Sequence, residues 1–199
     1  MMFKLIHYTD YKSPYAYLAL EDTLKLENDF RISIDWWPYT LDIPSYLGDV
    51  ESRDAHQWRK VKYAYMDCRR IANKRGLILK GPKKIYDSRD VDIALLYAKE
   101  QNAVPAFSRV VFERFFNHSI DVEDRAQVKQ ALLQAGIDES SFDAFADGPG
   151  GVIHDKIREE AESQGVFGVP AYLVEGELFW GGEKIPEIRA LLKEKGLER

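Results

Sequence analysis

Apolar and polar residues alternate in two segments near the start of the chain, as they do in strands that are buried on one face. The first segment is Phe3–Tyr8, and the second is Arg31–Trp37, which Pro38 ends. Between them, Ser13 and Pro14 predict the start of a helix, because serine is a favoured N-cap and proline presets φ at the next position. The first forty residues therefore predict a strand, a helix and a second strand.

The pattern becomes helical in the middle of the chain. From about Ser45 to Gln164 apolar residues recur at helical spacing, and no segment alternates as a strand would. The clearest helical segments are Trp58–Lys74, Val91–Gln101, Ala106–Asn117 and Glu123–Ala135. Glycines at positions 76 and 136, and the run from 148 to 151, predict helix ends. This part of the chain predicts an all-helical block.

Strand patterns return near the end of the chain. Ala171–Val174 and Leu178–Trp180 flank Gly176 and predict an antiparallel hairpin, and Ile185–Lys195 has the spacing of a closing helix. Without the helical block, the order is strand–helix–strand followed by strand–strand–helix, which is the thioredoxin arrangement.

We therefore predict an α/β, thioredoxin-like fold with a long helical insertion. Residues 1–40 and 165–199 form the thioredoxin-like domain, and residues 41–164 form the inserted helical domain. A chain of 199 residues is long enough for one core together with such an insertion.

Composition excludes several classes of protein. The 28 basic and 33 acidic residues give a net charge of −5, whereas a general nucleic-acid binder needs a basic excess. No apolar run approaches the roughly 18 residues of a membrane span, and the first ten residues lack the features of a secretory signal. The single cysteine, Cys68, cannot form an intramolecular disulfide. We expect a cytoplasmic protein that binds neither nucleic acid nor membranes, with Cys68 buried in a helix.

The turn after the first predicted strand is the first candidate site. Thiol–disulfide enzymes of this arrangement place a Cys-x-x-Cys here, where the helix N-terminus lowers the pKa of the thiol. In this chain the first and fourth positions are Ser13 and Ala16, so disulfide exchange at this turn is excluded. The residues alone leave two roles open for Ser13, a helix cap worth about 1 kcal/mol and a ligand-binding hydroxyl.

The second candidate site is the segment before the third predicted strand, Gly165–Pro170. Thioredoxin folds place a cis-proline at this point. Only about 5–6% of X-Pro bonds are cis, so the presence of a proline does not by itself predict a cis bond. The prediction rests on the position of Pro170 at the start of the third strand. We predict that Val169–Pro170 is a cis peptide facing the N-terminal end of the Ser13 helix.

Five sequence elements together carry a family resemblance. They are Ser13–Ala19; the spaced set Lys60, Tyr63, Asp67 and Arg70; Ala135–Asp138; Gly165–Pro170; and Glu177–Gly181. In this order, over nearly the whole chain, they resemble the 2-hydroxychromene-2-carboxylate isomerase family. That family is related to the kappa-class glutathione transferases and, more distantly, to the DsbA oxidoreductases.

The resemblance implies an enzyme that works with bound glutathione. The counterpart of Ser13 is the catalytic residue and hydrogen-bonds the glutathione sulfur, which suits a hydroxyl beside the free N–H groups of a helix. The counterpart of Val169, next to Pro170, pairs its backbone with the cysteinyl part of glutathione, and Lys60 corresponds to a lysine that meets the glycine carboxylate.

Two segments depart from the family pattern. Gly48–Arg53 lacks the Gly-Asn and paired prolines that often precede the lysine. Kappa-class relatives hold the γ-glutamyl end with Ser-Asp-Arg, where this chain has Gly182, Glu183 and Lys184. Glu183 is still suited to the γ-glutamyl ammonium, so we assign Gly182 and Glu183 to glutathione binding. Another small thiol remains an alternative.

The resemblance implies a homodimeric, glutathione-dependent isomerase whose substrate is an aromatic carboxylate, an aromatic-linked unsaturated keto acid. The alternatives are a kappa-like glutathione transferase and a non-catalytic DsbA-type binding protein. A positively charged pocket beside Ser13 would favour the isomerase, because its substrate carries a carboxylate.

Other chemistry-bearing residues have simpler interpretations. We interpret most of the basic residues between positions 69 and 84 as a solvated surface. A minority, Arg70 through its pairing with Asp67 among them, is expected to line the cleft. Residues interpreted as helical core are Trp58, Tyr63 and Tyr65. The four histidines lack the mutual spacing of a metal site.

Overall fold

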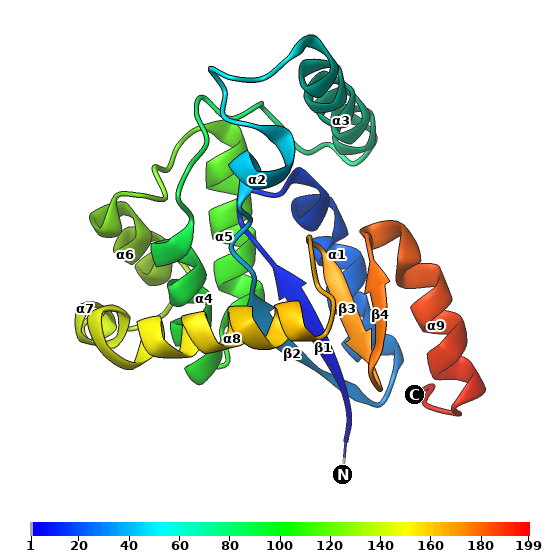
Figure 1. Ribbon diagram of the computed structural model, residues 1–199. Helices are drawn as coiled ribbons and strands as arrows, with labels where there is room; N and C mark the ends of the chain where they lie inside the picture. Colours follow the sequence, from blue (N-terminus) through cyan, green and yellow to red (C-terminus); the bar gives the residue numbers. More distant parts are fainter. Residues whose placement is uncertain (1) are drawn as a thin grey trace.

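The computed structural model describes residues 2–199, apart from the side chain of Tyr46. One mixed sheet has the strand order β2-β1-β3-β4. Its strands are β1 (Phe3–Thr9), β2 (Ile32–Pro38), β3 (Ala171–Val174) and β4 (Glu177–Trp180). β1 runs parallel to β2 and antiparallel to β3, and β3 and β4 form the predicted antiparallel hairpin (Figure 1).

Helices α1 (Pro14–Asp29) and α9 (Ile185–Glu194) complete the thioredoxin-like part of the chain. Between β2 and β3 the described residues form helices and no strand. These helices are α2 (Ile43–Leu47), α3 (Ala55–Lys74), α4 (Arg89–Glu100), α5 (Val104–Asn117), α6 (Arg125–Gln134), α7 (Phe142–Phe145), a π-helical turn (Ala146–Gly150) and α8 (Gly151–Ser163). The predicted α/β, thioredoxin-like fold with a helical insertion is confirmed.

The glycine run from 148 to 151 breaks the helix as predicted, although at one residue only, Gly148, whose dihedral angles are not helical. The chain passes from α7 through the π-helical turn directly into α8, with one kink at Gly148 (φ −121°, ψ −113°). At Gly150 an added Cβ would lie 2.5 Å from the Phe145 ring. This glycine therefore permits close packing and does not mark a helix end.

Helix α3 begins three residues earlier than its apolar spacing predicts. Asp54 caps it, accepting from Gln57 N at 2.7 Å, while Gln57 Oε1 accepts from Asp54 N at 2.9 Å. This reciprocal capping box satisfies two backbone donors at the start of the helix. The polar first turn is thus stabilised by capping and not by burial.

Aromatic side chains join the thioredoxin-like part to the insertion. Tyr17 of α1 stacks on Phe116 and Phe112 of α5, with ring centroids 5.1 and 5.4 Å apart, and Tyr11 contacts Phe112 at 4.9 Å. Each ring of this size contributes roughly 1.5–3 kcal/mol when it is fully buried. The turn that precedes α1 is therefore fixed against the insertion as well as against the sheet.

Helix α3 stands away from the sheet at one end of the molecule (Figure 1). Among its described side chains only Cys68 and Ala72 are buried, which confirms the expected burial of Cys68. Arg75, which follows α3, donates hydrogen bonds to Leu18 O and to Asp22 Oδ2 of α1. Most of α3 is thus free to face solvent or a cavity. None of the helices in residues 2–199 is long and apolar enough to cross a bilayer.

A substitution tests the packing of the segment after β4 against α1. A Cβ at Gly182 would lie 2.9 Å from Ala19 Cβ, so Gly182→Ala should lower the free energy of unfolding by about 1–3 kcal/mol. Gly81→Ala is the control, because its Cβ would make only ordinary contacts, with the end of the Arg69 side chain at 3.4 Å and with the Tyr65 ring at 3.9 Å. Urea unfolding followed by circular dichroism measures both, and equal midpoints would contradict this packing.

Candidate functional site

The turn between β1 and α1 presents a hydroxyl at the positive end of a helix. Ser13 is buried and is the N-cap of α1, its Oγ accepting from Ala16 N at 3.2 Å. Pro14 has no N–H, and the N–H of Tyr15 has no acceptor among the described residues. The turn therefore offers the Ser13 hydroxyl and one free amide, where the helix dipole favours negative charge.

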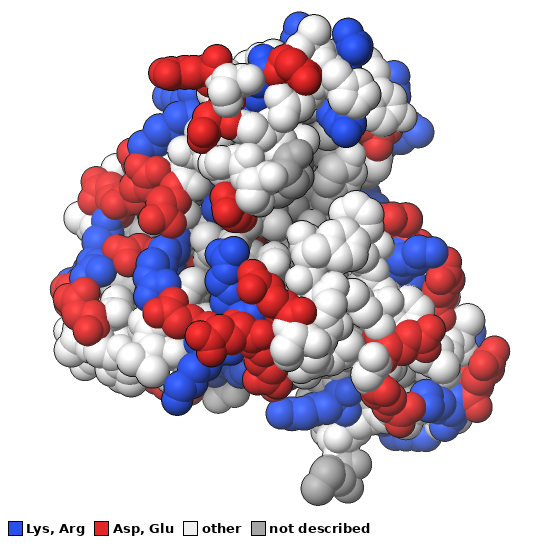
Figure 2. All heavy atoms as spheres, in the orientation of Figure 1, with Lys and Arg blue, Asp and Glu red and all other residues white. Residues whose placement is uncertain are grey.

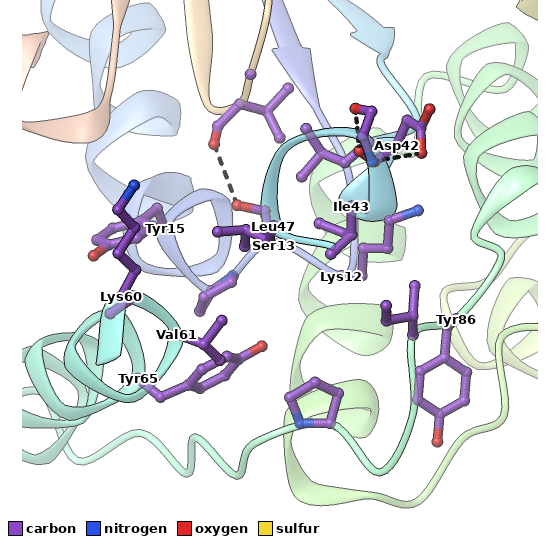
Figure 3. A pocket seen from close by; sticks show the side chains of 18 of the residues that line it. Lys12, Ser13, Tyr15, Asp42, Ile43, Leu47, Lys60, Val61, Tyr65 and Tyr86 are labelled. Atoms are coloured by element: carbon purple, nitrogen blue, oxygen red, sulfur yellow. Dashed lines mark hydrogen bonds between the residues drawn. The ribbon is translucent and has the colours of Figure 1, made fainter. Parts of the chain in front are cut away.

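The Val169–Pro170 segment faces this turn. The peptide is cis, as predicted, and Ser13 Oγ donates to Val169 O at 3.3 Å (Figure 3). Val169 is buried, yet its own N–H has no acceptor in the part of the chain that the structure describes. A buried amide without a partner is uncommon, and it marks this edge as a place where a ligand can pair with the backbone.

A cavity of about 1090 Å³ opens beside Ser13. Its walls come from α2, α3, the segment before α4, the end of α5 and the loop that precedes β3. Many of the lining residues are aromatic: Tyr15, Tyr39, Trp58, Tyr65, Tyr86, Phe115, Phe167 and Trp180. The space-filling view shows a hollow below the α2–α3 region, flanked largely by uncharged atoms (Figure 2). Such walls suit a ligand with an aromatic part.

The charged residues of the cavity are mostly basic. The basic ones are Lys12, Arg53, Lys60, Lys62, Arg69, Lys83, Lys84 and Arg158, against two acids, Asp42 and Glu162. Glu162 is already paired with Arg158 at 3.1 Å. The cavity is thus electropositive although the whole chain carries a net charge of −5. This local field favours an anionic ligand.

The structure brings together only part of the predicted site. Ser13, Lys60 and Val169 all line the cavity, with Lys60 on the same side of Ser13 as Tyr15 (Figure 3). Lys60 has no ion pair or hydrogen bond to any described residue.

Gly182 and Glu183 do not line the cavity, and neither does Pro170. Gly182 abuts Ala19 of α1, and the Glu183 side chain is exposed. The assignment of Gly182 and Glu183 to glutathione stays a prediction.

Helix α3 corrects two interpretations of its residues. Trp58 and Tyr65 line the cavity, although Tyr65 also packs against the edge of the core, and Tyr63 is 58% exposed. Arg70 pairs with Asp67 at 3.7 Å on the exposed side of α3, while Arg69 lines the cavity instead. The spacing of large residues on a helix is the same for a core as for a cavity wall, so the sequence could not separate them.

The only cysteine is unsuited to nucleophilic chemistry. Cys68 lies against Tyr15, and burial raises the pKa of its thiol to about 11. Burial likewise raises the pKa of Tyr15. Both groups are protonated at neutral pH, and a protonated thiol is a poor nucleophile. Within residues 2–199 no cluster of three or more His, Cys, Asp or Glu residues is placed to hold a metal ion.

Known proteins resemble this chain over almost its full length. Residues 4–193 match the family described as the DSBA-like thioredoxin domain. The chain is 28% identical over 189 residues to 2-hydroxychromene-2-carboxylate isomerase from Sphingobium xenophagum, covering 93% of this chain and 95% of that one. A solved structure of 2-hydroxychromene-2-carboxylate isomerase is similar with a TM-score of 0.79 at 24% identity, over 96% and 95% of the two chains. The cytosolic disulfide reductase DsbM from Pseudomonas aeruginosa, solved with GSH, has a TM-score of 0.66 at 15% identity, over 96% and 98%.

The absence of cysteine at the turn predicts an absence of disulfide chemistry. The protein should not reduce insulin disulfides, because Ser13 and Ala16 occupy the redox positions and the Cys68 thiol is buried. The double substitution Ser13→Cys with Ala16→Cys should introduce measurable reduction, since the helix terminus would lower the pKa of the new thiol. Insulin reduction by the unmodified protein, surviving in Cys68→Ser, would contradict this view of the turn.

Proposed function

The chain belongs to the DSBA-like thioredoxin domain family, and from this premise we propose that it is a glutathione-dependent isomerase of the 2-hydroxychromene-2-carboxylate isomerase type. The observation that carries the proposal is the buried Ser13 turn at the edge of an electropositive, aromatic cavity. The curated relative from Sphingobium xenophagum bears the name of this isomerase. The proposed substrate is an aromatic-linked unsaturated keto acid.

The unpartnered groups around Ser13 fit glutathione. The Tyr15 and Val169 amides and the Lys60 ammonium have no partners among the described residues, so a ligand can use all three without breaking existing bonds. A thiolate, a peptide backbone and a carboxylate are the matching groups of glutathione. When bound, glutathione supplies a thiolate that adds reversibly to a conjugated double bond and so frees it to rotate.

Ser13 holds the sulfur in this scheme. Its hydroxyl turns from Val169 O, at 3.3 Å, toward the sulfur, while its oxygen still caps Ala16 N. A hydrogen bond to a charged group contributes roughly 1.5–3 kcal/mol, enough to lower a thiol pKa by about one to two units. The free Tyr15 amide at the positive helix end adds to this effect.

The other residues orient the thiol. The N–H and C=O of Val169 pair with the extended cysteinyl backbone as a neighbouring strand would. Lys60 binds the glycine carboxylate, and Glu183, beside Gly182, binds the γ-glutamyl ammonium from the loop after β4. Contacts at both ends of the thiol hold the sulfur at Ser13 and leave the basic, aromatic remainder of the cavity for the substrate.

The charge of the cavity favours isomerisation over the two alternatives. Eight basic residues against two acids suit a substrate with a carboxylate. A kappa-like transferase acting on neutral electrophiles needs no such excess, and a DsbA-type binding protein for extended peptides needs no enclosed aromatic cavity. The GSH-bound disulfide reductase DsbM supports the capacity of this fold to bind the thiol.

Ser13→Ala tests the proposed function. The substitution should raise the pKa of bound glutathione and slow turnover roughly ten- to a thousand-fold, because one charged hydrogen bond is lost and the sulfur is misplaced. It should cost only about 1 kcal/mol of stability, the value of an N-cap. The measurements are the ultraviolet absorbance of the thiolate against pH and steady-state rates on a benzylidenepyruvate-type substrate.

Ser141→Ala is the matched control, because Ser141 lies outside the cavity and its side chain makes no capping hydrogen bond. It should leave both the thiolate pKa and the rate unchanged. If Ser13→Ala also leaves the thiolate pKa and the rate unchanged, Ser13 is only a helix cap, and the non-catalytic binding protein becomes the better interpretation.

A further inference from the structure

Lys12, directly before Ser13, is an unusually enclosed lysine. It lines the cavity, yet only 8% of its side chain is exposed. Its Nζ lies 3.1 Å from Ser88 Oγ and 3.4 Å from Asp10 Oδ2. Because these contacts already fix the Lys12 side chain, it loses little further conformational entropy when a ligand binds.

A directional hydrogen-bond network behind the cavity fixes Lys12. Ser88 donates to Asp92 Oδ2 at 3.0 Å, so the Ser88 oxygen is left to accept from Lys12. Thr40 donates to the same Asp92 oxygen at 2.6 Å. Thr40 then accepts from His154 Nε2 at 2.8 Å.

His154 meets Arg89 and Asp155 on one side of its ring, with Asp155 Oδ1 3.3 Å from Nδ1, and Thr40 on the other. Arg89 donates to its Nδ1 at 2.9 Å, which leaves Nε2 as the protonated nitrogen. Burial lowers the pKa of His154, in keeping with a neutral ring that accepts on one side and donates on the other. Hydrogen bonds from Ser88 and from the His154–Thr40 pair thus converge on Asp92. The Ser88 proton points toward Asp92, and the Ser88 oxygen faces Lys12.

The charge of Lys12 is only partly compensated. Burial raises the pKa of Asp92 well above its usual range, which weakens Asp92 as a negatively charged partner for Lys12. Asp10 remains as the counter-charge, but it also accepts the amides of Lys12 and Leu41, at 3.0 and 2.7 Å. Two of the three ammonium protons face Ser88 and Asp10, and the third has no acceptor in the described residues.

Lys12 and Lys60 lie on opposite sides of Ser13 (Figure 3). Consecutive Cα atoms are 3.8 Å apart, which keeps the Lys12 ammonium within about 10 Å of Ser13, the length of a small aromatic acid. Lys60 can therefore bind one end of the thiol, and Lys12 can bind a second ligand on the other side of the sulfur.

We propose that Lys12 binds the carboxylate of the substrate and selects anionic over neutral substrates. The proposal rests on the proposed function, because it places the substrate in the cavity beside Ser13. Asp10 and Ser88 are positioning residues, and they act on the substrate only through Lys12.

The test measures binding of trans-cinnamate and of its neutral amide, cinnamamide, by isothermal titration without glutathione. Wild type should prefer the carboxylate by roughly ten- to a hundred-fold, the value of one charged hydrogen bond. Lys12→Met should abolish this preference and leave cinnamamide binding unchanged. Lys62→Met is the control: Lys62 lines the cavity but is exposed, so the preference should stay within about twofold of wild type.

Lys12→Gln covers the case in which Lys12→Met does not fold, since it keeps a donor for Asp10 and Ser88 without the charge. Retention of the preference in a folded Lys12 variant would overturn the proposal. The proposal would also be overturned if Lys62→Met lost the preference for cinnamate to the same extent, or if the wild-type protein showed no preference. A failure of glutathione to bind would count against the proposed function and leave this result untouched.

Discussion

The N-terminal end of α1 is the constraint on which the site depends. Its first turn carries a proline without an N–H, an amide without an acceptor, and a serine that must cap the helix from a buried position. Asp10 holds this turn by accepting from Lys12 and from Leu41, where the insertion begins. With the turn fixed in this way, the positive end of the helix and the unpaired edge at Val169 face one another without reorganisation.

Local chemistry made much of the fold predictable. The Ser13–Pro14 helix start and the hairpin around Gly176 depend on residues close in sequence. The cis Val169–Pro170 bond is predicted from its place in the order of elements, and the structure confirms all three. Within the glycine run before α8, Gly148 breaks the helix, whereas Gly150 meets a packing need, its contact with Phe145, that no local pattern reveals. A glycine required for close approach looks the same in sequence as one that ends a helix.

The cavity was less predictable because it depends on how α3 stands relative to the rest. Trp58 and Tyr65 have the spacing of core residues, but α3 buries only Cys68 and Ala72, so these two aromatic side chains face the cavity. The net charge of the chain did not indicate the charge of the cavity, because the acidic residues lie mostly elsewhere while basic residues surround the cavity. The enclosure of Lys12 depends on Ser88, 76 positions away along the chain, so sequence alone gave no reason to single it out.

We propose above all that the Ser13 turn binds a small thiol as its thiolate. Calorimetric titration with glutathione and with S-methylglutathione, in two buffers of different ionisation enthalpy, tests it most directly. We expect glutathione to bind more tightly and to release a proton near neutral pH, whereas S-methylglutathione should bind weakly and release none. Equal affinity for the two, or no binding of glutathione, would contradict it.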